Sequence, residues 1–312
     1  MANGRTKLSV IGAGGVGVAV AYAALIRGSA SEVALYDVAT EKVDAEVLDL
    51  AHGTQFTASS VSGGSDLSVV DGSDVIVVTA GAKQQPGQTR MELAGTNVRI
   101  LQALMPALVE RAPDAVYIIV TNPADVMTVV AQRISGLPPQ RVFGSGTVLD
   151  TSRLRWRIAE RAGVSTASVH ADIVGEHGDT QFPLWSNATI GPVPILDWPS
   201  DDPFTPAELD RIAIEVRDAA YAVIRGKGAT NLAIGVSAAR IAEAVLNDEH
   251  AVLPVATVLD DVHGISGVAL SVPSVVSSAG AEALGETPMT ADEEARLAAS
   301  AAAIRAALDE LG

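Results

Sequence analysis

The sequence has 312 residues, which is enough for a large hydrophobic core and typically for two compact units. Hydrophobic residues make up 48% of it and charged residues 19%, a globular composition that argues against intrinsic disorder. The formal net charge of -16 argues against nucleic acid or an anionic membrane as a partner, because both would be repelled. The chain contains no cysteine, which excludes disulfides, thiolate nucleophiles and cysteine zinc sites. A reducing compartment is permitted, and we expect a cytoplasmic location.

Near its start the chain has an uncharged stretch, residues 8–26, preceded by two basic residues. Such a stretch fits a signal peptide, a membrane anchor or a nucleotide-binding fold. Within six positions it contains four glycines: Gly12, Gly14, Gly15 and Gly17. Each glycine in a helix interior costs about 1 kcal/mol, which argues against the first two alternatives. The pattern instead predicts a strand over residues 7–11, a glycine-rich turn and a helix ending near Gly28.

An acidic residue follows this glycine turn at the spacing of a dinucleotide-binding unit. Asp37 ends the next predicted strand, about 20 residues after Gly17, where its carboxylate would accept hydrogen bonds from the adenosine ribose. Gly12 allows the turn, Gly14 admits a pyrophosphate, and Gly17 lets helix and strand pack closely. Asp37 would repel a 2'-phosphate and no arginine follows it, so NAD is favoured over NADP. The alternative is a solvated carboxylate at a strand end.

Strands and helices alternate through the first half of the chain. The further apolar runs that predict strands lie over residues 74–82, 115–120 and 141–146, with helices between them. Continuous β-branched strands separated by helices indicate a parallel sheet covered on both faces. We therefore expect an α/β fold with a doubly wound, Rossmann-type NAD-binding domain over residues 1–146. Ligands bind beyond the carboxyl ends of such strands, which selects the loops after Ala80, Val120 and Gly144.

From about residue 147 the pattern becomes mixed, and we expect a C-terminal α+β domain for substrate binding and catalysis over residues 147–312. The predicted helices lie near residues 150–162, 206–225, 230–247 and 291–311. The predicted strands lie within residues 167–175, 182–190, 251–260 and 267–276. No repeat or low-complexity linker separates the halves, so we expect them to pack closely.

A loop over residues 81–90 brings a cation to the predicted ligand-binding edge of the sheet. It contains a Pro86-Gly87 turn between flanking glycines, which suits a mobile lid that carries Arg90 inward. A cation at the start of the following helix opposes the helix dipole, so another role should justify it. The alternative is an ordinary surface turn.

The helix predicted near residues 150–162 carries one acidic and several basic residues. Asp150, Arg153 and Arg157 share one face by their spacing, whereas Arg155 lies about 200° round from Arg153. The arginines at 153 and 155 therefore cannot do the same job. The alternative is a solvated helix with an ordinary Asp-Arg pair.

A single histidine, His177, lies between glycines after a predicted strand. A buried carboxylate bonded to one ring nitrogen would fix its tautomer and raise its pKa toward neutrality, which would make it a proton donor. A lone histidine is more often a packing or surface residue. The other histidines show neither the HExxH spacing nor a pairing with nearby carboxylates that would form a zinc site, so we expect no metal site.

Eight motifs in this order resemble the L-lactate and malate dehydrogenase family along essentially the whole chain: IGAGGVG, LDLAHG, TAGA, TNP, GSGTVLDTSRLR, GEHGD, KGAT and SVPS. The resemblance implies NAD-dependent hydride transfer, with His177 as acid and base and Asp150 orienting it. Arg153 would clamp the substrate carboxylate bidentately, a task that lysine performs poorly. Arg90 and Asn122 would polarise the ketone.

The resemblance also implies the rest of the cofactor site. Its residues would be Gly12, Gly14, Gly15, Val16, Gly17, Asp37, Ala80, Gly81, Asn122 and Ile234. Two departures from the family pattern are notable. Gln88 replaces a commonly acidic lid residue, and Asn231-Leu232 follow Thr230 where aromatics or serine are frequent.

Position 84 separates the substrates within the family. Malate-type enzymes have arginine there for the second carboxylate of oxaloacetate, and this sequence has Gln84. An unpaired buried carboxylate costs several kcal/mol, which would reject the diacid. We therefore expect reversible reduction of pyruvate to L-lactate, with Gln84 and Thr230 lining the small substrate pocket. The alternatives are a malate dehydrogenase, for which Lys83 would reach the second carboxylate, a broader L-2-hydroxy acid dehydrogenase, and a non-catalytic NAD-binding sensor.

A final similarity concerns regulation. Bacterial L-lactate dehydrogenases activated by fructose 1,6-bisphosphate use an arginine and a histidine at the positions of Arg155 and His170, where two subunits meet. The resemblance therefore implies this effector and a homotetramer. The alternative is ordinary surface charge at both positions.

Overall fold

The computed structural model describes residues 5–82, 90–285 and 287–311. The strands of the first half are β1 (Lys7–Ile11), β2 (Glu32–Tyr36), β3 (Ser60–Gly64), β4 (Val75–Val78), β5 (Val116–Ile119) and β6 (Val142–Gly144). The helices between them are α1 (Gly15–Arg27), α2 (Thr40–His52), α3 (Arg90–Arg111) and α4 (Ala124–Ser135). Strands β4 and β5 read VIVV and VYII and are buried throughout, because helices cover both faces of the sheet.

The second half combines helices with two small antiparallel sheets of short strands and three longer antiparallel strands. Its helices are α5 (Val148–Ala162), α6 (Pro206–Lys227), α7 (Leu232–Leu246) and α8 (Ala291–Leu311). Its short strands are β7 (Val169–His170), β8 (Ile173–Val174), β9 (Phe182–Pro183), β10 (Thr189–Ile190) and β11 (Val193–Pro194). Its longer strands are β12 (Ala251–Val258), β13 (Ala269–Ser277) and β14 (Gly280–Ala283). None of the helices described is long and apolar enough to cross a membrane.

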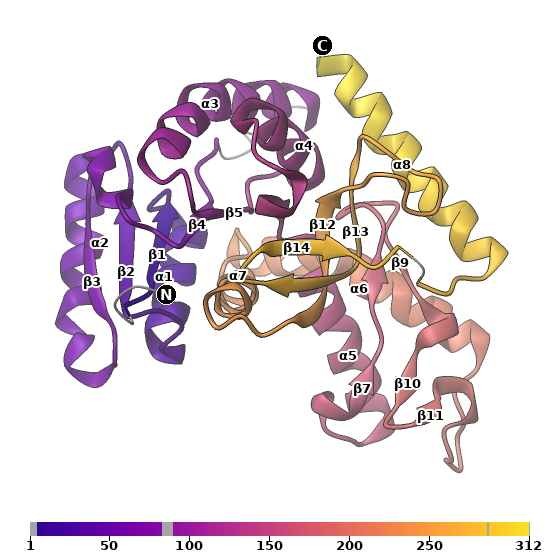
Figure 1. Cartoon of the computed structure of the whole chain (residues 1–312). Helices are drawn as coiled ribbons and strands as arrows, with labels where there is room; N and C mark the ends of the chain where they lie inside the picture. Colours follow the sequence, from indigo (N-terminus) through magenta and orange to yellow (C-terminus); the bar gives the residue numbers. More distant parts are fainter. Residues whose placement is uncertain (1–4, 83–89, 286, 312) are drawn as a thin grey trace.

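One nine-stranded sheet runs through both halves in the order β14-β13-β12-β6-β5-β4-β1-β2-β3 (Figure 1). Strands β1 to β6 pair in parallel, which confirms the predicted doubly wound sheet. Strands β12 to β14 pair antiparallel, and β12 joins β6 through Ala256 and Gly144. The order reverses between β1 and β4, and ligands bind in such sheets beyond the carboxyl ends of these two strands.

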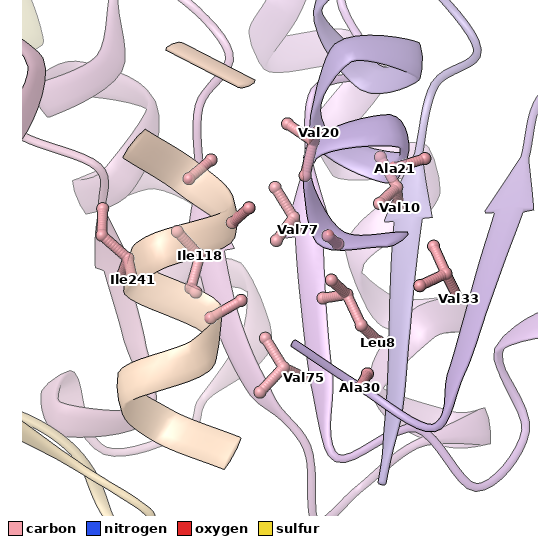
Figure 2. Close-up of a cluster of buried hydrophobic side chains, with 14 of the residues drawn as sticks. Leu8, Val10, Val20, Ala21, Ala30, Val33, Val75, Val77, Ile118 and Ile241 are labelled. Atoms are coloured by element: carbon pink, nitrogen blue, oxygen red, sulfur yellow. The ribbon is translucent and has the colours of Figure 1, made fainter. Parts of the chain in front are cut away.

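Two buried clusters cover the two faces of the parallel strands. On one face, Val10 and Val77 pack with residues of α1 and α7, including Ile241 (Figure 2). On the other face, Ile11 and Val78 pack with residues of α3, α4 and α8. Because successive strand residues point to opposite faces, β1, β4, β5 and β6 each contribute to both clusters.

Helix α7 belongs to the second half but packs directly against α1 of the first. A Cβ placed on Gly235 of α7 would lie 2.6 Å from the backbone carbonyl carbon of Ala19, so only glycine permits this approach. The contact brings the loop between α6 and α7 to the start of α1. The two halves therefore pack closely, as the sequence predicts.

Candidate functional site

The glycine turn after β1 is fixed to the end of β2. Gly12 has φ +106°, a conformation that favours glycine, and its N–H donates to the Tyr36 carbonyl at 2.7 Å. The N–H of Ala13 donates to Oδ2 of Asp37 at 2.7 Å, and Oδ1 of Asp37 accepts from the Ala39 N–H at 3.0 Å. The predicted ribose-binding carboxylate therefore lies directly beside the turn.

The start of α1 fits a diphosphate. A Cβ on Gly17 would lie 1.8 Å from the Gly12 carbonyl oxygen, so helix and turn touch, whereas a Cβ on Gly14 would meet nothing within 4 Å. No side chain caps the helix that begins at Gly15. Open space at Gly14 and amides without a side-chain cap are what the close approach of an anion requires. Val16 and Ile234, also predicted to contact cofactor, are half-buried in the first turns of α1 and α7.

The loops after β4 and β5 are tied together by a residue that sequence reasoning missed. Oδ1 of Asn97, in α3, accepts from the Ala82 N–H, and its Nδ2 donates to the Asn122 carbonyl, both at 2.7 Å. The Thr121 hydroxyl donates to the Ala80 carbonyl at 2.8 Å. Asn97 is buried in the middle of a helix, where only its polarity among apolar neighbours distinguishes it. These bonds fix the two loops beyond β4 and β5, which contain Ala80, Gly81 and Asn122.

One buried carboxylate joins the two residues predicted for proton transfer and substrate binding. Asp150, in the first turn of α5, is 2% exposed, and its Oδ2 lies 2.7 Å from Nδ1 of His177. Its Oδ1 accepts from a terminal nitrogen of Arg153 at 2.8 Å. The structure thus brings Asp150, Arg153 and His177 together from α5 and from the loop between β8 and β9.

This contact shifts the pKa of both partners. Burial opposes ionisation of Asp150, but the charge and hydrogen bond of His177, with the charge of Arg153, hold the pKa of that carboxyl below its ordinary value. Burial also opposes charge on His177, but the Asp150 carboxylate raises the pKa of the imidazole to about 8. His177 is therefore largely protonated at neutral pH.

A second buried carboxylate, which sequence reasoning also missed, holds the backbone of His177. Oδ2 of Asp125, in the first turn of α4, accepts from the His177 N–H at 2.7 Å. Its Oδ1 has no hydrogen-bond partner within the described ranges, and burial raises the pKa of this carboxyl to about 7. Both residues, with Glu176, line a cavity of about 180 Å³ on the α8 side of the loop. The TNPAD motif places Asp125 just beyond β5. An acidic residue at that position was the sequence signal from which this contact could have been predicted.

Arg153 also faces a larger cavity. A space of about 310 Å³ lies between α5, α6 and the start of α7, and its lining includes Arg153, Thr230 and Lys227. Two of the residues predicted to bind substrate, Arg153 and Thr230, therefore line one space. Gln84 lies outside the described residues, as does the side chain of Arg90, although the backbone of Arg90 begins α3 as expected.

The two residues predicted to bind an effector, Arg155 and His170, lie close together in the folded chain. The Arg155 guanidinium donates to the Ala171 carbonyl at 2.9 Å and to Oδ1 of Asp172 at 2.8 Å. His170, the preceding residue, is exposed on β7. Arg157 instead pairs with Glu160 and Glu215, as on a solvated helix face. Among the described residues, no group of three or more histidine and acidic side chains is placed to hold a metal ion.

Known proteins match nearly the whole chain. The models of the lactate/malate dehydrogenase NAD-binding domain and α/β C-terminal domain match residues 6–144 and 147–311. The chain is 47% identical to the L-lactate dehydrogenase of Bifidobacterium animalis subsp. lactis, covering 98% of this chain and 97% of that protein. It is 43% identical to that of a Synechococcus species, covering 98% and 99%. The minor L-lactate dehydrogenase of Enterococcus mundtii superposes with a TM-score of 0.94 at 36% identity, covering 99% of both chains.

Proposed function

Because the chain belongs to the lactate/malate dehydrogenase family and is thus an NAD-dependent oxidoreductase, we propose that it acts as an L-lactate dehydrogenase that reversibly reduces pyruvate to L-lactate. The observation that carries this proposal is the Asp150 carboxylate, which bonds His177 with one oxygen and Arg153 with the other. A proton donor and a carboxylate-binding cation are thereby held at one point. When bound, NADH supplies the hydride to the carbonyl carbon.

His177 acts as the acid in pyruvate reduction and as the base in lactate oxidation. Asp150 accepts the Nδ1 hydrogen bond, which leaves Nε2 to donate its proton to the carbonyl oxygen of the substrate. The raised pKa of His177, about 8, supports this role because the imidazole carries the proton to be donated at neutral pH. Asp125 holds the backbone of the same residue, so that both its main chain and its ring are fixed.

Arg153 binds the substrate carboxylate, and its bond to Asp150 orients the guanidinium for this task. Two parallel N–H groups of a guanidinium match the two carboxylate oxygens, which fixes the keto acid relative to His177. Arg90 and Asn122 polarise the ketone, and Thr230 lines the space for the methyl group. With glutamine rather than arginine at position 84, the chain supplies no cation there for the second carboxylate of oxaloacetate, which favours the monoacid.

The same proposal includes regulation by fructose 1,6-bisphosphate at Arg155 and His170. Its support is that Arg155 bonds the two residues following His170, which keeps both side chains in one region of the surface. Such a site would join two subunits of a homotetramer. A cytoplasmic location, expected from the sequence, stays a prediction.

Replacing His177 with asparagine tests the proposal. His177→Asn should abolish pyruvate-dependent NADH oxidation, a loss of about a hundredfold or more, because the proton donor is removed. NADH binding, measured by fluorescence titration, should be nearly unchanged. The wild-type enzyme should respond to added fructose 1,6-bisphosphate with a lower KM for pyruvate. Loss of both turnover and NADH binding in the variant would show instead that His177 is a packing residue.

A further inference from the structure

Asn231 precedes α7 but does not cap it. An asparagine at this position usually accepts a hydrogen bond from the first turn of its own helix, yet the Asn231 side chain makes no such bond. Its Oδ1 instead accepts from Nζ of Lys227 at 2.7 Å. Its Nδ2 lies near the glycine turn, 3.6 Å from where a Cβ on Gly15 would be. The amide of Asn231 therefore lies beside the first turn of α1.

Lys227 reaches this place from the end of α6. It precedes Gly228, whose φ of +82° ends the helix, and its side chain turns to Asn231. It also lines the cavity of about 310 Å³ that contains Arg153 and Thr230. A cation held between this cavity and the start of α1 is notable in a chain with 21 basic and 37 acidic residues.

We propose that Lys227, positioned by Asn231, binds the NAD phosphate nearer to the nicotinamide. The diphosphate belongs at the start of α1, where Gly14 leaves open space and no side chain caps the helix. The nicotinamide must lie toward Arg153 and His177, where substrate reacts. A cation between these two places meets the phosphate on the nicotinamide side. The pairing would hold the end of α6 against a cofactor bound at the start of α1.

The bond to Asn231 distinguishes this role from substrate binding. A free lysine side chain samples many rotamers, whereas a hydrogen bond at 2.7 Å holds the ammonium beside Asn231, whose amide lies near Gly15. Arg153 lies on α5 and is oriented by Asp150. The inference rests on NAD binding and is independent of the choice of pyruvate as substrate.

The test is cofactor binding by Lys227→Gln, measured as the dissociation constant of NADH by fluorescence titration of the full-length protein. We expect NADH to bind roughly fivefold more weakly at low salt, because one partly exposed charge-assisted hydrogen bond is lost, and the difference should shrink as salt is added. The matched control is Arg225→Gln, which removes the same charge two residues away, about 200° round α6, and should leave binding unchanged. Asn231→Ala should weaken binding less, since the ammonium remains.

Two fragments locate the contact. ADP-ribose contains both phosphates and should lose affinity for Lys227→Gln about as much as NADH does, whereas AMP lacks the nicotinamide-side phosphate and should bind as before. Equal loss for AMP would overturn the proposal in favour of a general effect of charge. An unchanged dissociation constant for NADH, with or without a raised KM for pyruvate, would overturn it as well. Equal weakening by Arg225→Gln would also contradict it, and equal thermal unfolding midpoints would exclude misfolding as the cause.

Discussion

At the scale of single residues, two buried carboxylates determine what His177 can do. Asp150 bonds its ring and Asp125 its backbone, so the imidazole is fixed from two sides. The proximity of His177, Asp150 and Arg153 could be predicted because their motifs combine spacing with a specific residue type. Asp125 and Asn97 were not predicted, because each acts by bonding the backbone of another loop. Such a contact depends on which strand ends lie side by side, and the local sequence does not encode this.

The pKa of His177 predicts the pH dependence of the reaction. The kcat/KM for pyruvate should fall as pH rises through about 8, because the imidazolium needed as acid is lost, and lactate oxidation should rise over the same range. In Asp150→Asn the carboxylate that raises the pKa is gone, so the fall should begin at lower pH, and the rate should drop by about a hundredfold. Steady-state pH profiles of both proteins measure this. A profile with the same inflection in the variant would assign the titration to another group.

At the scale of helices and strands, the sequence predicted best where burial is strongest. Strands β4 and β5 consist only of aliphatic and aromatic residues, because helices cover both faces of the sheet. The sequence therefore predicted both strands. Strand β3, with the sequence SVSGG, lies half-exposed at the sheet edge and has no apolar run to reveal it. The joining of β12 to β6 was also not predicted, because pairing between distant strands leaves no local pattern. The antiparallel strands therefore continue the sheet of the first half.

The contact between α1 and α7 predicts an unusual response to a small substitution. Gly235→Ala should destabilise the fold by about 1–3 kcal/mol, because the added methyl meets the backbone of Ala19 at 2.6 Å. It should also weaken NADH binding, since α1 carries the glycine turn. The control is Gly226→Ala in α6, where nothing lies within 4 Å and the better helix former should stabilise by about 0.5–1 kcal/mol. Denaturant unfolding measures both, and equal stability of the two variants would show that the helices can separate freely.

At the scale of the whole molecule, one sheet runs through both halves, and α7 of the second half packs against α1, which follows the glycine turn. The first half supplies the glycine turn and Asp37, and the second supplies Asp150, Arg153 and His177. Helix α7 locks the halves together through Gly235. The order of motifs in the sequence was enough to predict both contributions. The distances between these residues could not be predicted from the motifs, because the strand order of the fold decides which loops meet.

The most direct test of this account is the ratio of kcat/KM for pyruvate to that for oxaloacetate, measured by NADH oxidation. We predict that the wild-type enzyme favours pyruvate by at least about a hundredfold, because Gln84 supplies no cation for the second carboxylate of oxaloacetate. Gln84→Arg should reverse or abolish this preference by supplying the missing cation. A wild-type enzyme that prefers oxaloacetate, or a ratio that Gln84→Arg does not move, would contradict the account.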